Sequence, residues 1–155
     1  MHDKIILLIG EFTAVVSRCL FNHLDGIADE GLFIPIALPP KYIGMGLSAG
    51  FMEPLESTSI HLINTGINKL IALLTLDDIS DAARNTFNRL TGKEYARIRD
   101  FLILHYNATT RDDTEFWNYR RTMSVPDSLT EKVELFQTTG QIFREEDELF
   151  TETSW

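Results

Sequence analysis

A glycine-rich stretch followed by two carboxylates contains the residues of this sequence with the clearest chemical potential. Gly44, Gly46 and Gly50 allow the backbone to come close to a ligand or to another strand. Glu53 and Glu56 follow soon after the last of these glycines. A carboxylate held beside a ligand can act as a general base, or it can orient a cationic group.

The serine and threonine residues after these carboxylates predict the start of a helix. Ser57, Thr58 and Ser59 are all suitable N-caps. The N-terminus of a helix presents amide N–H groups and about half a unit of positive charge, so it can bind an anion. Spacing alone favours a plainer interpretation, in which a glycine-rich turn leads into an ordinary capped helix and Glu56 satisfies the helix dipole.

Helices are the elements that must position this stretch. Apolar residues at helical spacing follow it, and they are Ile60, Ile63, Ile67, Leu70, Ile71 and Leu74. A second helical pattern covers residues 83–105, where we expect Gly92 to break or bend the helix. A short helix is predicted at residues 114–121, with acidic residues at its positive end.

The last helix is predicted from a capping box. Ser128 and Glu131 have the spacing at which each side chain takes an amide of the first turn. The helix is expected to end near Gly140. The tail beyond it contains Phe150 and Trp155, which are unusual in an exposed terminus, so we expect a chain cut in mid-fold.

The first quarter of the chain has a different character. Residues 5–9 and 32–38 are short apolar runs, and three prolines in residues 35–40 limit that part to short or edge strands. We therefore expect residues 1–42 to be an irregular, strand-like part. Residues 43–155 are expected to contain a ligand-contacting loop followed by a helical region. The chain as a whole is predicted to be mostly α-helical.

The composition indicates one ordinary globular domain and argues against several partners. A length of 155 residues suggests a single domain with a real core. The 23 acidic residues exceed the 14 basic ones, and a net charge of −9 argues against general nucleic-acid binding. No apolar run approaches the roughly 20 residues of a membrane span. The single cysteine, Cys19, favours a reducing, cytoplasmic compartment. Neither His61 nor His105 has a second ligand at metal spacing, so we expect no metal site.

The glycine-rich stretch and the helix after it closely resemble the flavin-dependent tryptophan halogenases. The matching sequence is GLSAGFMEPLESTSIHLI at residues 46–63. The likeness continues in YARIRDFLILHY at residues 95–106, RDDTEFW at residues 111–117 and VPDSL at residues 125–129. It is nearly continuous over residues 43–155.

This resemblance implies an oxidoreductase of the monooxygenase type. In this family, reduced FAD and O2 turn chloride or bromide into hypohalous acid, which reaches a lysine and then halogenates the indole ring of tryptophan. The implied cofactors are FAD, O2 and a halide ion. The implied partners are tryptophan or another indole and a separate flavin reductase, and a homodimer is allowed for the full-length enzyme. The implied fold is an α/β FAD-dependent monooxygenase-like fold, of which this chain would be part of the helical substrate side.

The resemblance also implies roles for individual residues. Glu56 matches the carboxylate beside the substrate ring, which works together with the catalytic lysine. Thr58 and Ser59 match the positions whose backbone amides hold the halide, which agrees with the anion site predicted at the helix start. Phe150 falls near the region that holds the amino acid substrate. The loop that passes against the flavin matches Gly46, Leu47, Ser48, Ala49, Gly50 and Phe51.

Some features of the family are absent from this sequence. The motifs GxGxxG and WxWxIP do not occur, and no lysine stands in the context of the catalytic lysine. Residues 14–28 match only loosely and residues 29–42 do not match. We therefore expect a piece of a halogenase that is incomplete and inactive alone. The alternative function is a non-catalytic helical remnant or interaction module.

Overall fold

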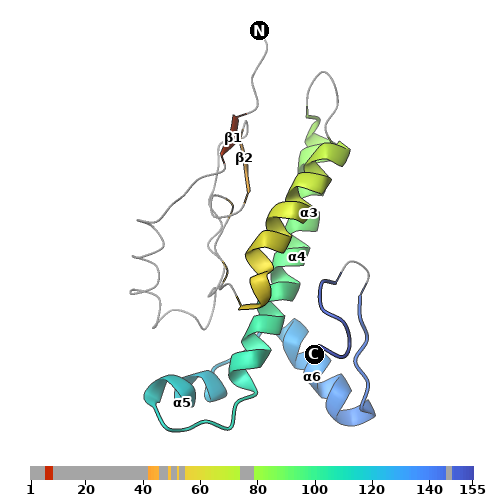
Figure 1. Ribbon diagram of the computed structural model, residues 1–155. Coiled ribbons are helices and arrows are strands. Elements are labelled where there is room, and N and C mark those ends of the chain that lie inside the picture. Colours follow the sequence, from red (N-terminus) through yellow and green to blue (C-terminus); the bar gives the residue numbers. More distant parts are fainter. Residues whose placement is uncertain are drawn as a thin grey trace. The chain divides into compact units, whose positions relative to one another are not determined.

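The computed structural model describes residues 6–8, 42–45, 49, 52, 55–73, 79–145 and 148–155. These residues form two short strands, one 3-10 turn and four α-helices (Figure 1). The chain divides into two compact units, residues 1–95 and residues 96–155. The change of character expected near residue 42 stays a prediction, because residues 9–41 lie outside the described ranges.

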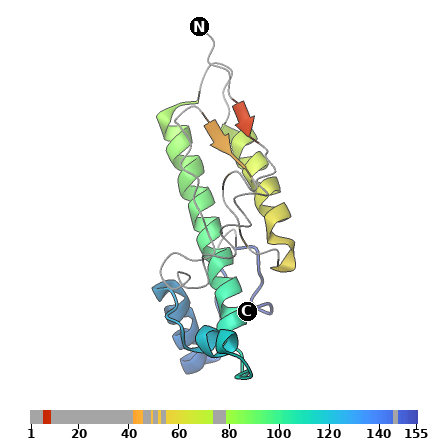
Figure 2. The same ribbon diagram turned by 90° about the vertical axis from the view of Figure 1, so that its left-hand side faces the viewer.

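The first unit contains a small parallel sheet and a pair of helices. Strand β1 (Ile6–Leu8) pairs with β2 (Tyr42–Gly44), so β1 lies within the first apolar run of the sequence. The strand expected at residues 32–38 lies outside the described residues. The 3-10 turn η2 (Leu55–Ser57) leads directly into α3 (Thr58–Leu73). Figures 1 and 2 both show α3 beside the first part of α4 (Asp81–Asn107).

Helix α3 forms where the apolar periodicity predicts it, but a different face is buried. Thr58, Leu62 and Gly66 are its buried residues, and their spacing of four places them on one face. Ile60 and Ile71, which belong to the predicted stripe, are 64% and 65% exposed. Apolar residues occur on several sides of this helix, so periodicity identifies the helix without identifying the face that packs.

Helix α4 is continuous through Gly92, so the break considered from the sequence does not occur. A glycine costs a helix only about 1 kcal/mol relative to alanine, which the contacts of a long helix can offset. In the second unit, α4 contributes the core residues Ile98, Phe101 and Leu102, each at most 2% exposed. Leu129 of the last helix is 1% exposed and belongs to the same unit.

Helix α5 (Glu115–Thr122) occupies the position predicted for a short helix. Its N-cap is Thr114, whose Oγ1 accepts a hydrogen bond from the amide of Trp117 at 3.4 Å. The guanidinium of Arg111 lies 4.5 Å from the centre of the Trp117 ring, so a cation–π contact also holds this helix start.

Helix α6 (Asp127–Thr139) forms as expected, but the predicted capping box is wrong. Pro126 precedes the helix, and no side chain caps it. Ser128 lies inside the first turn, where its Oγ donates a hydrogen bond to Oδ2 of Asp100 at 2.5 Å. Asp100 is buried, and depriving a buried carboxylate of a donor costs more free energy than leaving the helix start without a side-chain cap. Gly140 ends the helix with a φ of 68°, in agreement with the predicted end.

Candidate functional site

Two residues in the left-handed backbone conformation directly precede α3. Glu56 has a φ of 58° and a ψ of 24°, and Ser57 has a φ of 56°. Among the described residues, only these two adopt a positive φ without being glycine. The conformation costs a residue other than glycine about 1–2 kcal/mol. Such residues persist where the surrounding structure holds them, and they gather at functional sites.

The first turn of α3 begins immediately after this strained pair. Thr58 is completely buried, Ser59 is half-buried, and Glu56 is exposed. The N–H groups of a first helical turn have no acceptor within the helix, and they carry the positive end of the helix dipole. An exposed carboxylate therefore lies within two residues of a helix end that favours anions. This combination can hold a small anion and can accept a proton beside it.

The loop predicted to contact the flavin is described only in part. Gly46, Leu47, Ser48, Gly50 and Phe51 lie outside the described residues, and Ala49 is half-buried in a turn. The residues on either side of this loop, Met45 and Met52, are 5% and 1% exposed.

The buried Met45 packs over a glycine of α3. A Cβ placed on Gly66 would lie 3.5 Å from Sδ of Met45, which is an ordinary van der Waals distance. Met45 follows β2 directly in the chain. The contact therefore ties the end of this strand to the middle of α3.

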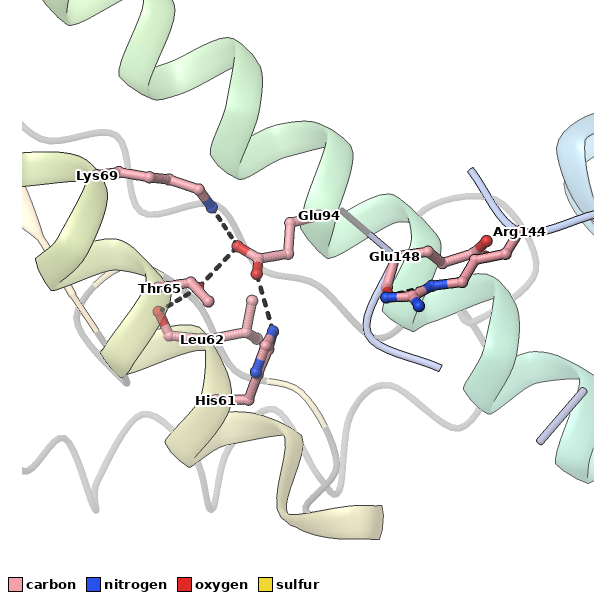
Figure 3. A network of polar contacts seen from close by, with 7 residues as sticks. All are labelled: His61, Leu62, Thr65, Lys69, Glu94, Arg144 and Glu148. Carbon is pink, nitrogen blue, oxygen red and sulfur yellow. Dashed lines mark hydrogen bonds and ion pairs between the residues drawn. The ribbon is translucent and has the colours of Figure 1, made fainter. Parts of the chain in front are cut away.

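A polar network joins α3 to the first part of α4 (Figure 3). Nε2 of His61 donates to Oε1 of Glu94 at 3.0 Å, and Oγ1 of Thr65 donates to Oε2 at 2.9 Å. Nζ of Lys69 forms an ion pair with the same Oε2. The Glu94 side chain is only 11% exposed, so these three donors take the place of most of the water that would otherwise bond its oxygens.

Tyr95 follows Glu94 and is itself buried, with 5% of its surface exposed. Burial raises the pKa of Tyr95 from 10.0 to about 12, and the negative charge of Glu94 adds to this increase. The phenol therefore keeps its proton further into the alkaline range than a solvent-exposed tyrosine does.

Phe150 lies in the second unit, within an aromatic cluster. Its ring stacks on Phe101 with centroids 3.5 Å apart and an interplanar angle of 11°. The ring of Trp155 meets the ring of Phe101 edge-on, with the two centroids 5.2 Å apart. Nζ of Lys132 lies 3.7 Å from the centre of the Trp155 ring. These contacts are packing within the unit, and a role for Phe150 in substrate binding stays a prediction.

A buried carboxylate anchors the chain next to Phe150. Glu148 is 3% exposed, and its Oε1 accepts a hydrogen bond from Nζ of Lys132 at 2.6 Å. Its Oε2 accepts from the amide of Glu145 at 3.0 Å. Its backbone carbonyl accepts from the guanidinium of Arg144, as Figure 3 also shows. Glu148 therefore acts as an internal anchor of this part of the chain.

Sequence reasoning missed Glu94 as a partner of α3. One signal was available, because His61, Thr65 and Lys69 are polar residues spaced four positions apart in this helix. That spacing predicts a shared polar face, but it does not identify the residue that meets it. The partner is separated from these donors by 25 to 33 residues of chain.

The described ranges contain no arrangement of three or more His, Cys, Asp or Glu side chains suited to a metal ion. None of the helices in those ranges is long and apolar enough to span a bilayer. The chemistry found there is that of a helix end that favours anions, beside an exposed carboxylate.

Comparison with known sequences places this chain in a family. Residues 37–155 match the sequence profile of the family described as tryptophan halogenase, so the expectation that residues 29–42 do not match is wrong for residues 37–42. The 7-chloro-L-tryptophan 6-halogenase KtzR of Kutzneria sp. (strain 744) is 36% identical over 96 residues, which are 62% of this chain and 19% of that protein. The tryptophan 6-halogenase SttH of Streptomyces toxytricini is 38% identical over 92 residues, or 59% of this chain and 18% of that protein. The chain thus spans about a fifth of the length of these relatives.

Solved structures agree with this assignment. A flavin-dependent halogenase from Xanthomonas campestris has a TM-score of 0.72 and 44% identity, over 76% of this chain and 24% of that one. BrvH, a flavin-dependent halogenase from Brevundimonas sp. BAL3, has a TM-score of 0.71 and the same identity, over 77% and 24%. These likenesses confirm the expected mostly helical part of a flavin-dependent halogenase fold. Because the family profile covers well over half of the sequence, the chain belongs to the tryptophan halogenase family.

Proposed function

We propose that this chain supplies the halide-binding helix end and the catalytic carboxylate of a flavin-dependent tryptophan halogenase. One observation carries the proposal: the exposed Glu56 lies in a strained turn directly before the first turn of α3. Membership of the family supports the same assignment. The substrate class is tryptophan or another indole, and the halide is chloride or bromide.

The residues at this site would have two tasks, which are to bind the halide anion and to accept a proton. When bound, reduced FAD together with O2 supplies the oxidising equivalent that converts a halide to hypohalous acid. A halide ion needs positive potential without directional bonding, and the backbone N–H groups at Thr58 and Ser59 offer it at the helix end. Halogenation replaces a hydrogen of the indole ring, and the Glu56 carboxylate accepts the proton released when the ring regains aromaticity. Its negative charge also orients the cationic lysine that works with it in this family.

The flavin itself is proposed to contact residues 46–51. The buried Met45 and Met52 support this assignment, because they hold the two ends of that loop within the first unit. A separate flavin reductase is the proposed partner, since each turnover consumes reduced FAD. The single cysteine and the need for reduced flavin favour the cytoplasm. A homodimer of the full-length enzyme stays an expectation from the family.

A chimera tests this function. Residues 43–155 of this chain would replace the corresponding segment of the flavin-dependent halogenase from Xanthomonas campestris, with which it shares 44% identity. With a flavin reductase, FAD, bromide and indole, the chimera is expected to form bromoindole, detected by mass spectrometry. The same chimera carrying Glu56→Gln is the matched control. A chimera that binds FAD and melts like the parent enzyme, yet forms no bromoindole, would support the non-catalytic alternative.

A further inference from the structure

Three donors on one face of α3 converge on a single carboxylate of α4. His61, Thr65 and Lys69 are spaced four residues apart, so they lie along one side of the helix over about 12 Å. All three contact Glu94, which therefore meets α3 at the level of Thr65 (Figure 3). A carboxylate bound at three levels of one helix restricts both the rotation and the sliding of that helix.

The contact with His61 is not needed to balance the charge of Glu94. Lys69 already supplies one positive charge to Oε2, and the hydroxyl of Thr65 donates to the same atom. Among the residues that the structure describes, His61 is the one that bonds Oε1. It differs from Lys69 in its position, because it lies three residues after Thr58, whereas Lys69 lies two turns further along. The His61–Glu94 hydrogen bond thus fastens the turn that forms the candidate halide site.

The strained residues just before this turn need such a fastening. Glu56 and Ser57 are both left-handed, and this conformation relaxes unless neighbouring contacts hold it. On one side of the pair, Met52 is buried, and on the other the buried Thr58 and the bonded His61 follow. We infer that His61 and Glu94 are positioning residues, which hold the first turn of α3 and the Glu56–Ser57 turn in the geometry that binds halide. The halide part of this inference rests on the proposed function.

The test compares four forms of the 155-residue chain: wild type, His61→Phe, His61→Gln and Lys69→Met. His61→Phe keeps a planar ring but removes the donor, and His61→Gln restores a donor of similar reach. Lys69→Met removes the other basic partner of Glu94 two turns away. The first readout is amide hydrogen exchange at Leu62 and Ile63, whose N–H groups donate to the carbonyls of Thr58 and Ser59 in an α-helix.

Without any halide, His61→Phe is expected to speed exchange at Leu62 and Ile63 by ~10-fold or more. Exchange in α6 should not change, and His61→Gln should restore the wild-type rates. Lys69→Met is expected to lower the melting temperature with little effect on these two amides. Uniform acceleration throughout α3, an equal effect of Lys69→Met, or a His61→Phe chain that fails to fold while Lys69→Met folds would each show a general structural role and overturn the inference.

The second readout is a sodium bromide titration at constant ionic strength, followed by the backbone amide shifts of Thr58 and Ser59. Bromide is expected to bind about fivefold more weakly to His61→Phe than to wild type, and His61→Gln should recover the affinity. Equal bromide affinity in wild type and His61→Phe would overturn the positioning role while the proposed halide site stands. If the amide shifts of Thr58 and Ser59 in the wild-type chain do not change with bromide, the proposed halide site is overturned. The hydrogen-exchange rates alone would then test whether His61 holds the first turn of α3.

Discussion

Glu56 combines a carboxylate, a left-handed backbone and a place directly before a helix start. Its exposed side chain is accessible to a ligand, while the completely buried Thr58 fixes the chain two residues later. The strained backbone is a feature that a simple helix cap does not need, because serine, threonine and aspartate cap helices in the ordinary extended conformation. The conformation therefore favours the functional interpretation of Glu56 over the purely capping one.

In the chimera, Glu56→Gln is expected to lower halogenation turnover by ~10²-fold or more, because glutamine keeps the shape but cannot accept a proton or attract a cation. The affinity for FAD should change little. Steady-state halogenation with a matched supply of reduced flavin, together with FAD titration, measures both quantities. Glu53→Gln serves as the control. If Glu53→Gln is more damaging, or Glu56→Gln retains full turnover, the catalytic carboxylate is assigned to the wrong residue.

The buried Tyr95 makes the stability of the first unit sensitive to pH in the alkaline range. Its pKa is raised to about 12 in the folded chain, so the folded state keeps its proton at pH values where the unfolded chain loses it. The resulting stability is complete below pH 10 and is lost as the pH rises toward 12. We expect the free energy of unfolding to fall through this range by roughly 1 kcal/mol per pH unit more in wild type than in Tyr95→Phe. Urea unfolding at several pH values measures the difference, and parallel curves for the two proteins would contradict it.

At the scale of elements, α4 contains residues of both units. It contributes Glu94 to the first unit and Phe101 and Leu102 to the second. Gly92 lies within it, exposed, and a Cβ added there would meet no atom within 4 Å. The glycine therefore has no packing role in the described structure, and its only effect on the helix is entropic.

Gly92→Ala is expected to raise the free energy of unfolding by about 0.5–1 kcal/mol, since alanine loses less backbone freedom in a helix. Gly140→Ala is the opposite case. Its φ of 68° ends α6 in the left-handed conformation, so alanine there should destabilise the protein by about 1 kcal/mol. Urea denaturation of both variants provides the comparison. A loss of stability in Gly92→Ala would indicate that the glycine has a role in α4 beyond chain entropy.

At the scale of the whole molecule, the loop proposed to contact the flavin belongs to this chain, whereas the phosphate-binding motif GxGxxG of the family does not occur in its sequence. A loop that meets the flavin ring gives only part of the binding energy, because dinucleotide cofactors depend heavily on the helix end that holds their phosphates. Association with the 155-residue chain alone should therefore be weak.

We expect this chain alone to bind FAD no more tightly than about 1 mM, which corresponds to roughly −4 kcal/mol. Isothermal titration calorimetry with oxidised FAD measures this directly. The chimera is the positive control, because it contains the phosphate-binding part of the parent enzyme. Micromolar binding by the 155-residue chain would show that residues outside the family motif hold the cofactor.

The sequence by itself predicted the described helices and the stretch in which the candidate site lies. Local periodicity predicts α3, and residues next to each other in the chain, from Glu56 to Ser59, mark the carboxylate and the helix end. Such features depend on neighbouring residues, so a sequence contains them directly. The assignment of residues 46–51 to a loop that contacts the flavin comes from the resemblance to the family, and it stays a prediction, as does the role of Phe150.

Only the tertiary structure decided which face of α3 is buried and which residue meets its polar face. Leu62 and Gly66 pack inward while Ile60 and Ile71 remain exposed, and hydrophobicity alone does not distinguish these positions. Glu94 meets His61 across 33 residues of chain, and a partner at that separation is selected by the packing of two helices. The left-handed conformation of Glu56 and Ser57 was also decided by the tertiary structure. Neither residue type favours this conformation, and only surrounding contacts can maintain it.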